Sequence, residues 1–124
     1  MKEIVFVFLG GGAGSVFRYL LHLSMNGRGP VSGFPWSTFT VNVLGSLLIG
    51  IFYALSARFH LSNETRLFLT VGLCGGFTTF STFSGESLFL LKEGMYLTLA
   101  SYVISSILLG IPAVLAGAYL IRKV

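Results

Sequence analysis

Four long apolar stretches, separated by short polar turns, constrain the fold of this chain more than any other feature. They run over residues 4–25, 36–59, 64–91 and 95–121. A helix needs about 20 mainly apolar residues to cross a bilayer, so each stretch is long enough to do so. Only 10% of the 124 residues are charged and 54% are hydrophobic, more apolar surface than so short a chain can bury by itself. We therefore predict an all-α, multi-pass membrane protein with a single domain over residues 1–124.

Polar turns and helix breakers mark the ends of these stretches. Residues 26–30 read Asn-Gly-Arg-Gly-Pro, residues 60–65 form a short polar link, and residues 92–94 read Lys-Glu-Gly. The first stretch resembles a secretory signal, with Lys2 before an apolar run and then small residues. It continues further than a signal would and three more stretches follow, so a first membrane helix is the better interpretation.

The positive charges are divided almost evenly between the two ends of the predicted bundle. Four spans would place both termini on one side of the membrane. That side would carry Lys2, Arg58, Arg66, Arg122 and Lys123, and the other Arg28, Lys92 and Arg18. A bias of five to three weakly favours cytoplasmic termini and permits insertion in either direction. The scattered cations form no basic face for nucleic acid.

The third stretch contains residues that disfavour a continuous helix. Residues 75–86 read Gly-Gly-Phe-Thr-Thr-Phe-Ser-Thr-Phe-Ser-Gly-Glu. Two glycines followed by β-branched residues predict a break between Gly76 and Thr79. Irregular backbone at membrane depth persists only where protein or a water-filled cavity covers it. Such breaks are where ion sites form, because freed carbonyls can hold a cation and a helix N-terminus attracts an anion.

Polar side chains inside the spans are the candidates for function, because they are costly at membrane depth. Four-residue steps place them on single helix faces: Gly10, Gly14, Arg18 and His22; Asn42, Ser46 and Gly50; Thr78, Thr82 and Glu86; Thr98, Tyr102 and Ser106. Amides and hydroxyls could hydrogen-bond neighbouring helices or donate to an anion. Arg18 could anchor an interface or supply a fixed positive charge. Glu86 lies near a helix end, where a carboxyl could be interfacial or protonated.

Phe80 and Phe83 lie three residues apart on a separate face of the third stretch. Packing against lipid or protein would explain this spacing. Alternatively, the partially positive edges of the two rings could receive a small anion. No enzyme is predicted, because His22, His60 and Cys74 form no metal-ligand or nucleophile pattern.

The run from Gly75 to Phe83 closely resembles the signature of the CrcB/Fluc fluoride channels. Arg18-Tyr19, after a glycine-rich segment, and residues 42–46, Asn-Val-Leu-Gly-Ser, resemble the same family. The resemblance covers essentially the whole chain. It implies an antiparallel, dual-topology homodimer in the cell (inner) membrane that exports fluoride passively. It also implies two fluoride pathways along the subunit interface and a structural sodium ion at the centre of the dimer.

The resemblance also implies roles for individual residues. Backbone carbonyls of Gly75 and Thr78 from both copies would hold the sodium ion. Asn42 would be the pore amide, and Phe80 and Phe83 the pore phenylalanines. Four residues would form or flank a polar track: Thr82, Glu86, Tyr102 and Ser106. Arg18 matches the first-helix arginine of the family, whose role would be structural or vestibular.

Two other functions remain open from the residues alone. A small multidrug exporter is also a short four-helix dimer, but it needs an embedded carboxylate. Glu86 is the only candidate, and Arg18 would repel a cationic drug. A non-transporting assembly subunit would turn its polar stripes only toward other helices. Ion flux from liposomes would discriminate among the three.

Overall fold

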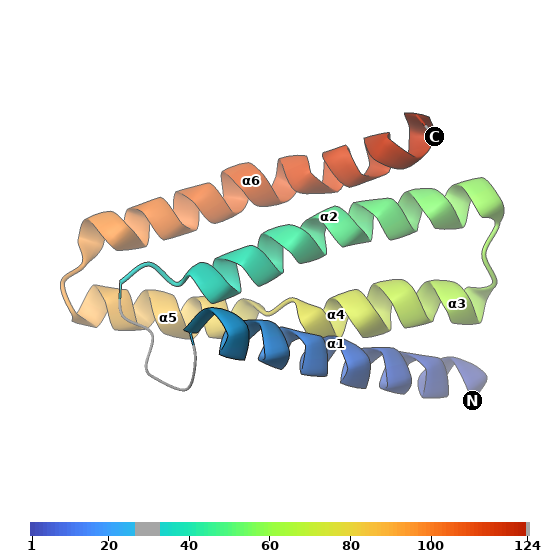
Figure 1. The fold of residues 1–124 in the computed structure, drawn as a ribbon, viewed down its shortest axis with the longest axis horizontal. Coiled ribbons are helices and arrows are strands. Elements are labelled where there is room, and N and C mark those ends of the chain that lie inside the picture. Colours follow the sequence, from blue (N-terminus) through green and yellow to red (C-terminus); the bar gives the residue numbers. More distant parts are fainter. Residues whose placement is uncertain (27–32, 124) are drawn as a thin grey trace.

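The computed structural model describes residues 1–26 and 33–123, and these are almost entirely helical (Figure 1). The elements are α1 (Lys2–Asn26), α2 (Trp36–Phe59), α3 (Asn63–Leu67), the π-helix η1 (Phe68–Cys74), α4 (Gly75–Phe77), α5 (Phe80–Lys92) and α6 (Tyr96–Lys123). Four helical segments of the described chain, over residues 2–26, 36–59, 63–92 and 96–123, are long and apolar enough to cross a membrane. The prediction of an all-α chain with four potential spans is confirmed. Most of the predicted turn at 26–30 lies outside the described residues.

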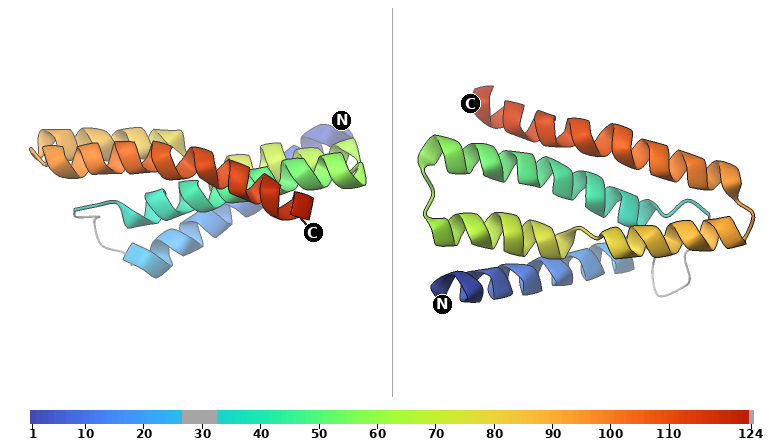
Figure 2. Two further views of the ribbon diagram at one scale, coloured as in Figure 1. Left: turned by 90° about the horizontal axis from the view of Figure 1, so that it is seen from above. Right: turned by 180° about the vertical axis from the view of Figure 1, so that it is seen from behind.

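The helices pair with partners that are not their neighbours in sequence. The most extensive packing joins α2 to α6, and the next joins α1 to η1 and α4. Figures 1 and 2 show α1 beside the third span and α6 beside α2, with the two ends of the chain at the same end of the bundle. The two ends lie together because the chain has an even number of spans.

Glycines allow these helix pairs to approach closely. A Cβ added at Gly10 or Gly14 would run into backbone atoms of η1 and α4. At Gly50 and Gly117 it would run into the backbones of α6 and α2, respectively. Small residues at such seams let main chains pack directly, as is typical of membrane helices.

The third span is not uniform along its length. Gly75 keeps helical dihedral angles, φ −62° and ψ −39°, at the start of α4. Thr78, at φ −83° and ψ 160°, and Thr79, at φ −153° and ψ 120°, are extended. The Thr79 side chain then caps α5 by accepting a hydrogen bond of 3.2 Å from the backbone N–H of Thr82. The extended pair thus consists of threonines rather than glycines.

Little of the apolar surface is buried within one copy. Among the described residues, the buried hydrophobic side chains are Val41, Cys74, Phe77, Leu90 and Tyr102. Large apolar residues are exposed on every span. This pattern is the one expected of a chain whose outer surface meets lipid or a partner.

Candidate functional site

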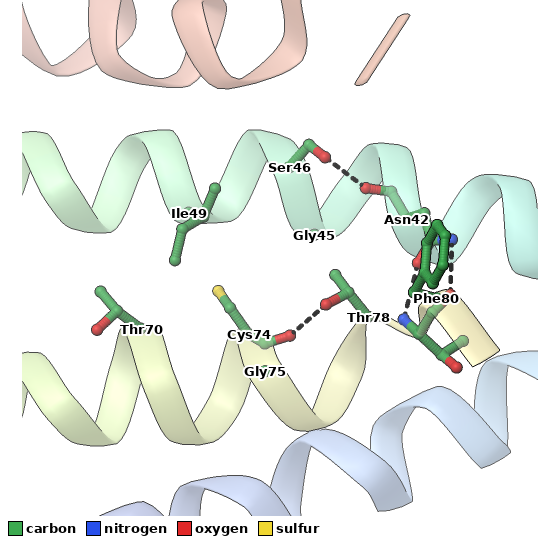
Figure 3. Close-up of a pocket in the computed structure, with 10 residues that line it drawn as sticks. Asn42, Gly45, Ser46, Ile49, Thr70, Cys74, Gly75, Thr78 and Phe80 are labelled. Atoms are coloured by element: carbon green, nitrogen blue, oxygen red, sulfur yellow. Dashed lines mark hydrogen bonds between the residues drawn. The ribbon is translucent and has the colours of Figure 1, made fainter. Parts of the chain in front are cut away.

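Asn42, on α2, holds the interruption of the third span through two hydrogen bonds. Its Nδ2 donates to the Thr79 carbonyl at 3.1 Å, and the Thr79 N–H donates to its Oδ1 at 2.9 Å (Figure 3). The side-chain amide therefore gives the Thr79 N–H the acceptor that a continuous helix would have supplied. It also gives the Thr79 carbonyl a second donor, beside the bond that this carbonyl makes as the N-cap of α5. Nδ2 carries two N–H groups, and the second has no acceptor among the described residues, so it is available to a ligand.

The same hydrogen bonds free two backbone carbonyls. In a continuous helix the N–H of Thr79 would bond the carbonyl of Gly75, but it donates to Asn42 instead. Likewise the N–H of Thr82 bonds the Thr79 hydroxyl rather than the carbonyl of Thr78. The carbonyl oxygens of Gly75 and Thr78, the two predicted sodium ligands, thus lack their usual helical partners. Carbonyl oxygen suits a hard cation, so these residues fit a sodium ion.

An open pocket of about 370 Å³ lies between α2 and the third span at this point (Figure 3). It brings Asn42, Gly75, Thr78 and Phe80 together around one space. The remaining lining residues are Gly45, Ser46, Ile49, Thr70, Cys74 and Thr79. Within the described chain, no three His, Cys, Asp or Glu side chains gather around a potential metal position. The oxygen and nitrogen ligands that this pocket offers are therefore carbonyl, amide and hydroxyl groups, beside the thiol of Cys74.

Three buried side-chain oxygens have no hydrogen-bond partner among the residues that the structure describes. They are Oε2 of Glu86, the hydroxyl of Tyr102 and Oγ of Ser106. The other carboxylate oxygen of Glu86 accepts a hydrogen bond from the Thr38 hydroxyl. Buried polar groups are rarely left without partners, because each costs about 1–3 kcal/mol. The polar track predicted for α5 and α6 therefore has capacity for a further ligand.

Aromatic rings adjoin this track. The rings of Phe80 and Phe83 have centroids 5.8 Å apart, and Phe83 lies 4.9 Å from Tyr102. Tyr102 is fully buried, whereas 78% of Phe80 is exposed. One copy of the chain therefore encloses one end of this row of rings and leaves Phe80 uncovered.

Arg18 and Thr82 border a second pocket of about 190 Å³, between α1, α2 and α5. His22 lies in its wall, with Nδ1 3.3 Å from the Ser37 hydroxyl. Thr79 lines both pockets and is the residue that joins them. Arg18 thus lies in a different pocket from the one bordered by Gly75 and Thr78. Its predicted role, structural or vestibular, stays a prediction.

Sequence reasoning did not single out two of the residues that organise the site. Thr38 holds the Glu86 carboxylate, and Thr79 carries the backbone that Asn42 clamps. Neither is unusual by itself, because threonines are common in apolar helices. A signal for Thr79 existed only in its position inside the predicted break.

Comparison with known proteins identifies the relatives of this chain. The sequence profile described as "CrcB-like protein, Camphor Resistance (CrcB)" matches residues 5–118. A "Fluoride-specific ion channel FluC" of Bacteroides fragilis is 61% identical over 122 residues, which cover 97% of this chain and 96% of that protein. Its namesake from Phocaeicola vulgatus is 56% identical over 120 residues, with 97% and 98% covered. Another from Nitrobacter winogradskyi is 45% identical over 122 residues, with 98% and 96% covered.

These proteins are named as ion channels, and ion channels are not enzymes. The resemblance noted at residues 75–83 is therefore confirmed along nearly the whole chain, and the chain belongs to the CrcB-like protein family.

Proposed function

We propose that this chain forms a fluoride-selective channel in the cell (inner) membrane, which lets fluoride leave the cell passively. The observation that carries the proposal is the row of buried oxygens beside the ring of Phe83 that have no hydrogen-bond partner in the described chain: Glu86 Oε2, the Tyr102 hydroxyl and Ser106 Oγ. The names of the relatives supply the identity of the ion.

The chemistry of the row suits a small anion. An ion that leaves water needs donors in place of its hydration shell, and the hydroxyls of Tyr102 and Ser106 can donate. The remaining N–H of Asn42 offers another donor. The rings of Phe80 and Phe83 present partially positive edges without the full charge that would trap the ion. Thr82 and Glu86 flank this path, and Arg18 attracts anions toward the second pocket.

A second copy of the chain completes the pathway in this proposal. Phe80 is largely exposed, and the larger pocket is open at one side, so an antiparallel partner would cover both. The weak charge bias permits the two orientations that such a dimer requires. Lipid would cover the remaining apolar surface.

The freed carbonyls of Gly75 and Thr78 would hold a structural sodium ion at the centre of this dimer. The ion would supply a fixed positive charge beside the anion path. This chain contributes the arrangement that exposes the carbonyls, because the Thr79 N–H donates to Asn42 Oδ1 and the Thr82 N–H donates to the Thr79 hydroxyl.

Fluoride efflux from liposomes that contain the purified protein tests the proposal. A fluoride electrode measures release, and a chloride electrode provides the control. Release of fluoride without chloride supports the channel. Drug-dependent proton flux without fluoride release would favour the multidrug exporter, and a verified dimer that releases no ion would favour the assembly subunit.

A further inference from the structure

Phe34 is held in a rigid backbone segment immediately before α2. Gly33 has a positive φ of 76°, which turns the chain. Pro35, at φ −80° and ψ 75°, lies at the centre of an inverse γ-turn, in which the N–H of Trp36 donates to the Phe34 carbonyl at 2.9 Å. Pro35 is fully buried, and its carbonyl accepts from the N–H of Phe39 at 3.1 Å, which begins the helix. The position of Phe34 is therefore tied to the start of α2 by the turn at Pro35.

The ring of Phe34 is in contact with Tyr102 of α6. Its centroid lies 5.4 Å from that of Tyr102, at 75°, in an edge-to-face arrangement. Tyr102 in turn lies 4.9 Å from Phe83. Tyr102 is thus packed between a ring of the proposed ion path and a ring that precedes α2.

These two ring contacts are part of the packing that orients Tyr102. Its hydroxyl makes no hydrogen bond to the described residues, although the Thr38 hydroxyl and the Glu86 carboxylate lie near it. The side chain is fully buried, so the rings packed against it limit which way the hydroxyl points. Removing the ring of Phe34 would leave one side of the Tyr102 ring unsupported and allow it to occupy other positions.

We infer that Phe34 is a positioning residue of the ion pathway, which holds the Tyr102 ring against Phe83 so that the Tyr102 hydroxyl faces the anion. The inference rests on the proposed function, and it extends the pathway to a residue outside the four spans. An aromatic pair contributes enough free energy to change the population of one ring position by about two- to twelvefold. Replacement of Phe34 should therefore lower fluoride flux by about this factor.

Simple anchoring of the start of α2 is the competing explanation, and Phe39 provides a matched control. Phe39 packs against Phe34 at 5.4 Å and against Trp36 at 6.0 Å, in the same aromatic cluster. Its ring is not paired with Tyr102 among the described ring contacts. A general loss of packing would affect Phe39 and Phe34 variants alike, whereas positioning of Tyr102 affects only the Phe34 variants.

Fluoride flux of dimeric variants in liposomes tests the inference. Phe34→Ala should lose about two- to twelvefold in flux, Phe34→Tyr should retain the wild-type flux, and Phe39→Ala should change by less than about twofold. Phe34→Ala combined with Tyr102→Ala should be no slower than Tyr102→Ala alone, because Phe34 acts through Tyr102. Where Phe34→Ala lowers the yield of dimer, Phe34→Leu serves as the non-aromatic variant.

Equal losses for the Phe34 and Phe39 variants would overturn the inference, as would losses that multiply in the double variant. Unchanged flux in Phe34→Ala would overturn it as well. These outcomes leave the proposed function in place, because the wild type still conducts. A folded wild-type dimer that conducts no fluoride would instead overturn both.

Discussion

Replacement of Asn42 by alanine should release the interrupted segment of the third span. Alanine is the most favourable residue in a helix, so the change does not weaken α2 itself. The Asn42→Ala change removes the amide that the Thr79 N–H and carbonyl bond at 2.9 and 3.1 Å. The carbonyl keeps its bond within α5, whereas the N–H loses its acceptor. The loss thus falls on the backbone of the third span rather than on α2.

The size of the effect follows from the N–H left without a partner and from the second bond that the carbonyl loses. A buried backbone group without a hydrogen bond costs about 1–3 kcal/mol, and an ordinary hydrogen bond contributes about 1 kcal/mol. Thr79 is only half-buried, so its N–H lies at the lower end of the first range. We expect the free energy of unfolding to fall by about 2 kcal/mol, and fluoride flux to fall with it because the freed carbonyls of Gly75 and Thr78 lose their arrangement.

Unfolding of the purified protein by SDS in mixed micelles measures the stability, and liposome efflux measures the flux. Ser46→Ala is the matched control, because Ser46 Oγ donates at 2.8 Å to the Asn42 backbone carbonyl on the same face. That variant should remain within about 0.5 kcal/mol of the wild type. An Asn42→Ala protein as stable as Ser46→Ala would refute the stabilisation of the third span by the hydrogen bonds between Asn42 and Thr79.

Substitutions at three further places test other parts of the structure. Phe80→Ile or Phe83→Ile should slow fluoride efflux sharply while gel filtration still shows the dimer; unchanged efflux would remove the ring-edge mechanism. Thr38→Val removes the hydroxyl that bonds the carboxylate on α5 and should lower both flux and stability, the latter by about 1–3 kcal/mol, whereas Thr38→Ser should retain them. Gly14→Ala should lower the SDS unfolding free energy by about 1–3 kcal/mol, because its Cβ would meet backbone atoms of the third span. Gly12→Ala should leave the unfolding free energy unchanged, because an added Cβ there meets nothing within 4 Å. Equal losses for the two variants would contradict the close packing of α1 on the third span through Gly14.

The four spans could be predicted because a membrane imposes a minimum length on every apolar helix. The π-helix over Phe68–Cys74 could not, since its sequence, Phe-Leu-Thr-Val-Gly-Leu-Cys, has no feature that separates it from an α-helix. Its hydrogen bonds shift by one residue, and the choice between the two forms depends on tertiary packing. Here α1 packs against it through Gly10, an interaction between residues far apart in sequence.

The candidate site could be predicted in part, because the membrane also makes buried polar residues conspicuous in the sequence. Asn42, Glu86 and Tyr102 stood out because polar groups at membrane depth require an explanation. Thr38 lies 48 residues before the carboxylate that it holds, and the Asn42 amide lies 37 residues before its partner Thr79. Only the folded bundle brings such pairs together, and hydroxyls near helix ends carry no signal of their own.

The pairing of α1 with the third span and of α2 with α6 also determines the order in which the bundle can assemble. During synthesis α1 and α2 enter the membrane first, yet they have few contacts with each other. At about 5–20 residues per second, several seconds pass before residues 68–77 and then α6 are made. Until then the glycine faces of the two early helices lack their partners, so we expect the bundle to form by late docking of the second half of the chain onto the first.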